Sequence, residues 1–232
     1  MKMKKYFLTA GLIFALLPFD CAAQFDLSET GYIDVSVNNI MFSGSYEGNG
    51  YFIAGNDAVL IPKLTPGGGL GIAFGVCGAH APVAFEFAYR INFSEYTTMY
   101  EEIKGRATTH VIQLLGVKWY IPRASFEKTR VKLFLDFDLS FVTTRCNKVT
   151  YEDGIVGVEE KGRPANFKAV AFGGGAGLQF MITDKLALFA KTKPEWHICA
   201  GLKPKGSEGY TIDDNFNNLM LLNCIGLTFY FK

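Results

Sequence analysis

The chain has 232 residues, and its 23 lysines and arginines against 22 aspartates and glutamates give a net charge of +1. Because the positive and negative charges nearly cancel, the net charge argues against a nucleic-acid partner. Hydrophobic residues make up 49% of the chain, with 21 Phe and 11 Tyr, and the length is that of one domain.

The first residues predict a secretory signal peptide. Lysines lie among the first five residues, and the apolar stretch 6–19 is shorter than the ~20 residues of a membrane-spanning helix. Small residues then precede the expected cleavage between Ala23 and Gln24. A lipoprotein site at Cys21 is an alternative, although Asp20 stands where that signal has a small residue. The prediction is a signal peptide over residues 1–23 and one domain over residues 24–232.

Residues Gly69 to Cys77 alternate between small and large side chains. Small residues occupy every second position, and Leu70, Ile72 and Phe74 lie between them. Because side chains alternate across a strand with a period of two, this segment predicts a strand with one small face and one apolar face. The pattern recurs along the chain and predicts eight strands, at residues 32–43, 69–78, 82–93, 109–121, 131–146, 168–182, 185–202 and 217–232.

Three of these strands depart from strict alternation. The first loses its phase at residues 39–40, where we expect a bulge. In the fourth, Gln113 falls on the apolar face, and Ile112 and Leu114 fall on the other. Pro194 cannot donate a ladder hydrogen bond, so we expect the membrane part of the seventh strand to end near it.

The connections between the strands alternate between long and short. Small outer-membrane barrels have short periplasmic turns, long outside loops and both termini in the periplasm. We therefore predict an all-β fold: an eight-stranded antiparallel up-and-down transmembrane β-barrel with its long loops facing outside. Ten strands would result if the first long connection inserted as a membrane hairpin. The connections are 44–68, 94–108, 147–167 and 203–216 on the long side, and 79–81, 122–130 and 183–184 on the short side.

Alternation alone does not say which face lies inside. A soluble lipocalin-like barrel would bury the large apolar face and expose the other face to water. That other face, however, is dominated by Gly and Ala and interrupted by single charges, which suits the narrow interior of an eight-stranded barrel. We therefore expect the large apolar face to contact lipid.

Two segments carry a resemblance to a known family. Residues 111–120, VIQLLGVKWY, resemble the fourth-strand pattern of small porin-like outer-membrane β-barrel proteins. Residues 227–232, LTFYFK, are similar to the aromatic C-terminal signal read by the barrel-assembly machinery, except that Lys232 follows the last aromatic residue. The layout resembles the transmembrane domain of OmpA and OmpX. The resemblance implies an integral outer-membrane protein of a Gram-negative cell, in contact with outer-membrane lipid and lipopolysaccharide and with the assembly machinery during biogenesis.

Ten charged residues, five of each sign, fall on the small face of the predicted strands. Charges in so narrow a lumen must pair or keep water, because isolated burial costs many kcal/mol. The narrow bore favours a charge-paired plug over the alternative, a gated ion path. The predicted lumen charge network consists of Asp34, Glu86, Arg90, Lys118, Lys132, Asp136, Asp138, Lys191, Lys193 and Glu195.

No catalytic constellation is evident. We place His80 in a short turn, and His110 and His197 inward near the outer rim. His197 and Glu195 share a face, but no nucleophile accompanies them. We therefore predict no enzymatic activity, no catalytic residue and no cofactor.

The four cysteines of the exported domain, Cys77, Cys146, Cys199 and Cys224, lack the spacing of metal ligands, so we predict no metal site. Alternation places all four on the small face. A disulfide such as Cys146–Cys199 is allowed in an oxidising compartment, but the sequence does not assign the pairing.

The long loops are the remaining candidates for function, because loops on a rigid scaffold commonly carry binding. In loop 44–68 the apolar segments 51–54 and 58–61 flank Gly55-Asn56-Asp57, which predicts a hairpin beyond the membrane. We predict a structural or surface-interaction role through these loops, toward an unidentified extracellular ligand. The alternative is a narrow porin-like channel for ions or small solutes.

Overall fold

The protein is described here from a computed structural model. The signal peptide, its cleavage site between Ala23 and Gln24, and the lipoprotein alternative at Cys21 lie outside the described residues. No helix among the described residues is long and apolar enough to cross a membrane. The structure describes residues 26–43, 51–54, 57–60, 63–79, 81–97, 104–121, 126, 129–146, 162–164, 167–199 and 217–231.

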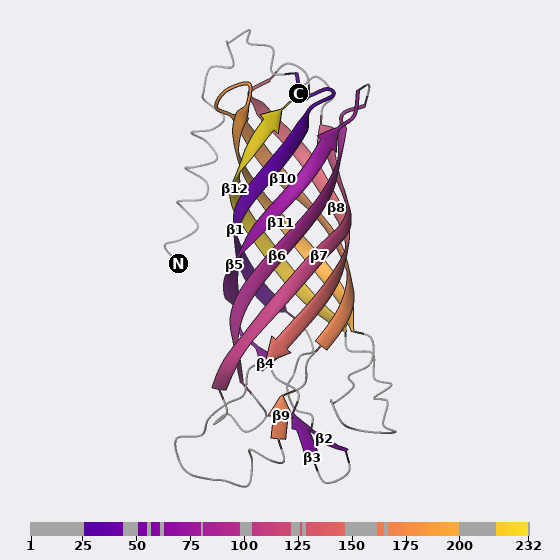
Figure 1. The fold of residues 1–232 in the computed structure, drawn as a ribbon, viewed down its shortest axis with the longest axis vertical. Helices are drawn as coiled ribbons and strands as arrows, with labels where there is room; N and C mark the ends of the chain where they lie inside the picture. Colours follow the sequence, from indigo (N-terminus) through magenta and orange to yellow (C-terminus); the bar gives the residue numbers. More distant parts are fainter. Residues whose placement is uncertain are drawn as a thin grey trace, which may run out of the picture.

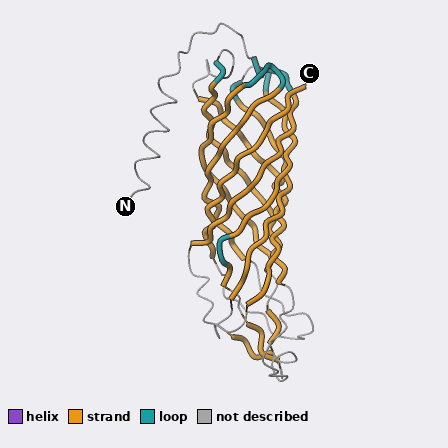
Figure 2. Tube along the Cα trace, turned by 90° about the vertical axis from the view of Figure 1, so that its left-hand side faces the viewer, coloured by secondary structure: helices purple, strands orange, loops and turns teal. Residues whose placement is uncertain are grey.

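Eight long antiparallel strands close into a barrel, as predicted (Figure 1). Each strand pairs with its neighbours along the chain, and β1 pairs with β12 to complete the ring. The strands are tilted, so that in Figure 2 those of the near wall cross those of the far wall. The barrel strands are β1 (Gly31–Ser43), β5 (Gly67–Cys77), β6 (Val83–Thr97), β7 (Lys104–Ile121), β8 (Val131–Cys146), β10 (Phe167–Met181), β11 (Leu186–Cys199) and β12 (Asn217–Phe231).

The two ends of the barrel differ. One end, which we call the turn end, holds the short turn 182–185 and the end of β12 at Phe231 (Figures 1 and 2). The other end, the loop end, is where β1 ends at Ser43 and β6 ends at Thr97. The loop-end connections 44–66, 147–166 and 200–216 are longer than the turn-end connections, as predicted. The connection between β6 and β7 is the exception: these strands extend past their predicted ends, so it covers only residues 98–103 and is shorter than the turn-end connection 122–130.

Beyond the loop end lies a small second sheet (Figure 1). β2 (Tyr51–Ala54) and β3 (Asp57–Leu60) form the predicted hairpin, and β9 (Gly162–Pro164) pairs with β3 in parallel. β4 (Lys63–Leu64) returns the chain to the barrel by pairing with the end of β6. The first long connection therefore extends the barrel instead of adding two strands to it, and the ten-stranded alternative is wrong.

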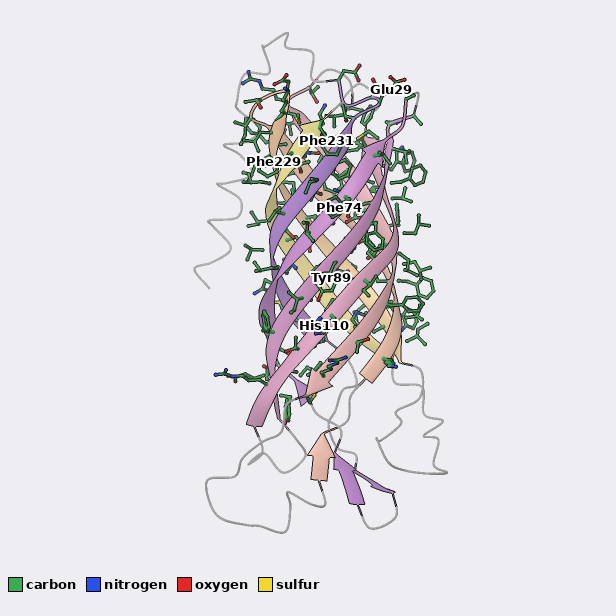
Figure 3. All side chains as sticks on the ribbon, viewed as in Figure 1. Glu29, Phe74, Tyr89, His110, Phe229 and Phe231 are labelled. Atoms are coloured by element: carbon green, nitrogen blue, oxygen red, sulfur yellow. The ribbon has the colours of Figure 1, made fainter. Side chains whose placement is uncertain are left out.

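The large apolar side chains face outward, around the whole barrel (Figure 3). Val37 is 64% exposed and Ile225 is 63% exposed, whereas the neighbouring residues on their strands, the inward Asn38 and Cys224, are buried. The soluble-barrel alternative is wrong, because it requires this face to be inside. Further members of this apolar belt are Val35, Leu70, Phe74, Phe87, Leu133, Phe137, Leu178, Leu188, Leu227 and Phe229.

A β-bulge in β7 corrects the prediction for the fourth strand. The pairing of β7 with β8 shifts between Gln113 and Leu115, so that Leu114 and Leu115 both face outward. Gln113 is buried in the lumen and Ile112 is exposed, the reverse of the prediction. The extra residue changes the phase of the alternation, which a fixed period of two does not follow.

The bulge expected in β1 is absent. β1 stays in register with β12 from Gly31 to Ser43, and Ile40 is fully buried inside the barrel. The sequence pattern breaks at this point because an apolar side chain faces the lumen, against Phe189 and Leu222. The strand end expected near Pro194 is not found either, because β11 continues to Cys199. Its pairing with β10 is interrupted opposite Gly174 and Gly175 and resumes in the same register.

Candidate functional site

Apolar side chains close the lumen at the turn end. Phe126 lies in the connection between β7 and β8 and packs on Tyr120, with 5.1 Å between ring centroids. Lys132 Nζ donates a hydrogen bond to the Phe126 carbonyl oxygen at 2.8 Å. Gln179 accepts from the Tyr120 hydroxyl at 3.3 Å and donates to the Tyr230 hydroxyl at 2.5 Å. This turn-end seal consists of Leu27, Tyr32, Cys77, Ala84, Tyr120, Phe126, Phe134, Met181, Ala187 and Tyr230.

On the loop-end side of the turn-end seal, Lys118 bridges two carboxylates. Its Nζ lies 2.6 Å from Asp34 Oδ2 and 2.5 Å from Glu86 Oε2. Glu86 also accepts hydrogen bonds from the Tyr32 hydroxyl and from Gln113 Nε2, each at 3.1 Å. Both oxygens of the Glu86 carboxylate are therefore held. The bulge in β7 is what brings Gln113 into this cluster, and simple alternation missed it.

Lys191 continues the ion pairs toward the loop end. Its Nζ lies 2.8 Å from Asp136 Oδ2 and 3.7 Å from Glu86 Oε1. Lys193 follows on the same strand, with its Nζ 3.8 Å from Asp136 Oδ2 and 2.9 Å from Asp138 Oδ2. Each of these cations therefore bridges two acids at successive levels of the lumen.

Arg90 completes the network near the loop end. Its Nη2 lies 2.6 Å from Glu195 Oε1 and 3.7 Å from Asp138 Oδ2. Glu195 also lies 3.3 Å from Lys193 Nζ and 3.6 Å from His197 Nε2. The ion pairs thus run without a break from Asp34 to Glu195.

The structure joins nine of the ten predicted lumen residues in this single network, and the tenth, Lys132, lies apart at the turn-end seal. All the side chains of the network are at most 9% exposed. Because the paired groups come from five of the eight strands, β1, β6, β7, β8 and β11, the network ties opposite walls of the barrel together across its interior. Partnered charges of this kind avoid the large penalty of isolated burial.

Inward glycines provide the room for these long side chains. A Cβ added at Gly173 would collide with the Asp138 carboxylate, and one at Gly177 would collide with Phe134. At Gly175 the added atom would meet the backbone and the Cβ of Lys193. The small face of the predicted strands is therefore the space that the charged side chains occupy.

Two of the three histidines, His110 and His197, lie among the described residues. His110 faces outward and not inward as predicted, and its Nδ1 lies 2.7 Å from the Tyr89 hydroxyl (Figure 3). Its inward neighbour in sequence, Thr109, is buried. His197 is buried beside Glu195, and His80 lies outside the described residues. Within the described part of the chain, no three His, Cys, Asp or Glu side chains are grouped as a metal site.

The cysteines are consistent with small residues that fill space. Cys77 belongs to the turn-end seal, and Cys224 is buried beside Ile40 and Leu222. The side chain of Cys199 lies outside the described residues, so the structure does not test the Cys146–Cys199 pairing, which the sequence allows without assigning it.

No family model matches the sequence, and no curated protein is similar to it. Its fold, however, is similar to solved outer-membrane proteins. OprG from Pseudomonas aeruginosa is 9% identical with a TM-score of 0.55, covering 89% of this chain and 97% of that chain. Neisserial surface protein A is 14% identical with a TM-score of 0.53, covering 87% of this chain and 97% of that chain. A major outer membrane protein from Thermus thermophilus is 10% identical with a TM-score of 0.50, covering 86% of this chain and 99% of that chain.

These likenesses are far too distant in sequence to transfer a function, and they show the fold alone. The outward apolar belt adds the surface that such a fold presents to lipid. The chain is therefore an integral outer-membrane β-barrel with the fold of the small eight-stranded barrels that its sequence resembles.

Proposed function

We propose that this barrel has a structural or surface-interaction role, acts through its loop end, and is neither an open channel nor an enzyme. One observation carries the proposal: an unbroken ion-pair network runs through the lumen on the loop-end side of an apolar seal. An ion path would need these pairs to separate, and separation would leave charges unpaired in a narrow interior.

The loop end supports a surface role. The parallel pairing of β3 with β9 joins two long connections that are about 100 residues apart in sequence. The hairpin β2–β3 therefore stands on the barrel as a braced extension and not as a separate loop (Figure 1). Such a platform suits contact with a ligand outside the cell, which the sequence does not identify.

The orientation is part of the proposal. Short turns and a chain terminus at one end are typical of the periplasmic side of such barrels, which puts the loop end outside. There, Arg106, Arg145 and Lys168 are exposed on neighbouring strands, where they suit the phosphates of lipopolysaccharide. Near the turn end, outward Phe231 and inward Tyr230 form the aromatic ending that we propose the assembly machinery reads.

Epitope display tests the orientation. An epitope inserted after Gly157, in the connection between β8 and β9, should bind antibody on intact cells. The matched insertion between Thr183 and Asp184, in the turn between β10 and β11, should bind antibody only after the outer membrane is permeabilised. The reverse pattern would overturn the proposed orientation.

Replacing the hairpin 51–60 with a Gly-Ser stretch tests the role of the loop end. Cells that carry this variant should lose adhesion to immobilised extracellular-matrix protein, or autoaggregation, while the folded barrel remains in the membrane.

The alternative function, a narrow porin-like channel, is tested separately with proteoliposomes. We expect no swelling in glycine or arabinose, whereas rapid swelling would favour the channel.

A further inference from the structure

The apolar belt of the barrel is interrupted on one side by three polar residues in a row. Asn39 on β1 pairs with Asn223 on β12, and Asn223 pairs with Thr192 on β11. The Thr192 hydroxyl donates a hydrogen bond to Asn223 Oδ1 at 2.8 Å. Because these positions share the outward parity of the belt, the row faces the membrane and not the lumen.

The row lies within the belt and not beyond its edge. Along each of the three strands, exposed hydrophobic side chains lie on the turn-end side and on the loop-end side of the polar residue. These flanking residues are Val37 and Met41 on β1, Ile225 and Leu219 on β12, and Leu188 and Trp196 on β11.

Small residues surround the polar row. Gly68 pairs with Asn39, and Ala176 pairs with Thr192. Gly174 follows on the same face of β10, and a Cβ added there would meet only Phe137, at an ordinary contact distance of 3.5 Å. The neighbouring inward Gly173 is different, because its Cβ would collide with Asp138. The packing of the lumen therefore does not require a glycine at position 174. The absence of a side chain there flattens the outer surface of the barrel.

Polar groups that face hydrocarbon lack the hydrogen-bond partners that water would supply. Within membranes, such groups together with small residues are the features that hold protein surfaces against one another. The Thr192 hydroxyl already engages Oδ1 of Asn223, which leaves the amide of Asn39 and the Nδ2 group of Asn223 facing outward. An asparagine amide is self-complementary, since it carries both donors and acceptors.

We propose that this face is an interface between two copies of the chain within the membrane. We define the face by Asn39, Asn223 and Thr192 with Gly68, Gly174 and Ala176. Two copies inserted in the same orientation can be related by a two-fold axis along the membrane normal, and the same face then meets itself. The polar rows supply donors and acceptors to one another, and the small residues let the two backbones approach closely. No third component is needed.

Energy transfer between donor-labelled and acceptor-labelled full mature chains in phosphatidylcholine vesicles tests this interface. Transfer above the level of random proximity is expected for the wild type, falling as unlabelled chain is added. The double variant Asn39→Leu with Thr192→Val should weaken association about tenfold or more, because symmetry removes each lost contact twice. The control Thr143→Val makes the same hydroxyl-to-methyl change outward on β8, which lies opposite β1 in the ring and carries no residue of this face, and should leave association unchanged.

A second variant separates loss of association from loss of folding. Gly174→Leu should keep the heat-dependent gel migration of the folded barrel, because the lumen does not occupy its Cβ position. It should still abolish the transfer, because the added side chain holds the copies apart. Wild-type transfer no higher than random proximity, or equal transfer in all variants, would overturn the proposal. So would a bound lipid in native mass spectra that depends on Asn39 in a chain that stays monomeric.

Discussion

Arg90 and Glu195 form an ion pair across the full width of the barrel. Their strands, β6 and β11, lie four apart in a ring of eight, and Nη2 of Arg90 is 2.6 Å from Oε1 of Glu195. Both side chains are almost completely buried. The pair therefore joins opposite walls, and each partner depends on the other for its charge to be tolerated there.

Removing Arg90 alone should destabilise the barrel strongly. Arg90→Ala leaves Glu195 with less compensation, and we expect the free energy of unfolding to fall by about 3–5 kcal/mol. Urea titration of the refolded protein, followed by heat-dependent gel migration, measures this. The double variant Arg90→Met with Glu195→Leu should recover most of the loss, because no unpaired charge remains. An unchanged midpoint for Arg90→Ala would contradict the packed lumen.

Lys118 should be as important at the other end of the network. Lys118→Met leaves the carboxylates of Asp34 and Glu86 without the cation that they share, with an expected loss of about 3–5 kcal/mol. Adding Asp34→Asn to this variant removes one of the two charges and should restore part of the stability. If Asp34→Asn instead added to the loss, the shared cation would not be the reason for it. The same urea titration decides between these results.

Neighbouring glycines on β10 should respond differently to alanine. Gly173→Ala places a methyl group against the Asp138 carboxylate and should lower stability by about 1–3 kcal/mol through overpacking. Gly174→Ala points outward, where the contact with Phe137 is ordinary, and should change stability little. Similar effects at the two positions would mean that the assignment of inward and outward faces on β10 is wrong.

The Phe126 side chain should contribute to the stability of the barrel and not to its closure against ions. Phe126→Ala empties part of the turn-end seal and should lower the free energy of unfolding by about 3–5 kcal/mol. The ion-pair network on the loop-end side of the seal remains, so the variant should still pass no ions. Ion conduction in this variant alone would show that the seal, and not the network, closes the barrel.

Much of the fold could be predicted from the sequence because lipid and lumen impose opposite demands on alternate residues. The fifth strand, predicted at residues 131–146, is β8 with the same bounds, since its outward positions from Val131 to Phe141 are all large and apolar and its burial alternates along the strand. The same logic placed the ten charged residues on inward-facing strand positions. It failed at Gln113 and His110, because one inserted residue at Leu114 and Leu115 reverses the phase on one side of it.

The partners within the lumen could not be predicted. The stagger between strands that are distant in sequence decides which acid pairs with Lys118 and which with Arg90. The alternation of side chains along one strand contains no information about this stagger. Ile40 shows a second limit, because the lumen near the loop end accepts apolar side chains and a hydrophobic residue there does not mark the lipid face.

Single-channel recording tests the central claim, that the ion-pair network closes the lumen. The refolded mature chain, shown to be folded by heat-dependent gel migration, is inserted into a planar bilayer under an applied voltage. We expect a folded protein that produces no conductance steps. Steady openings that scale with salt concentration, and that change in Arg90→Ala or Glu86→Gln, would contradict the account and make the barrel a channel.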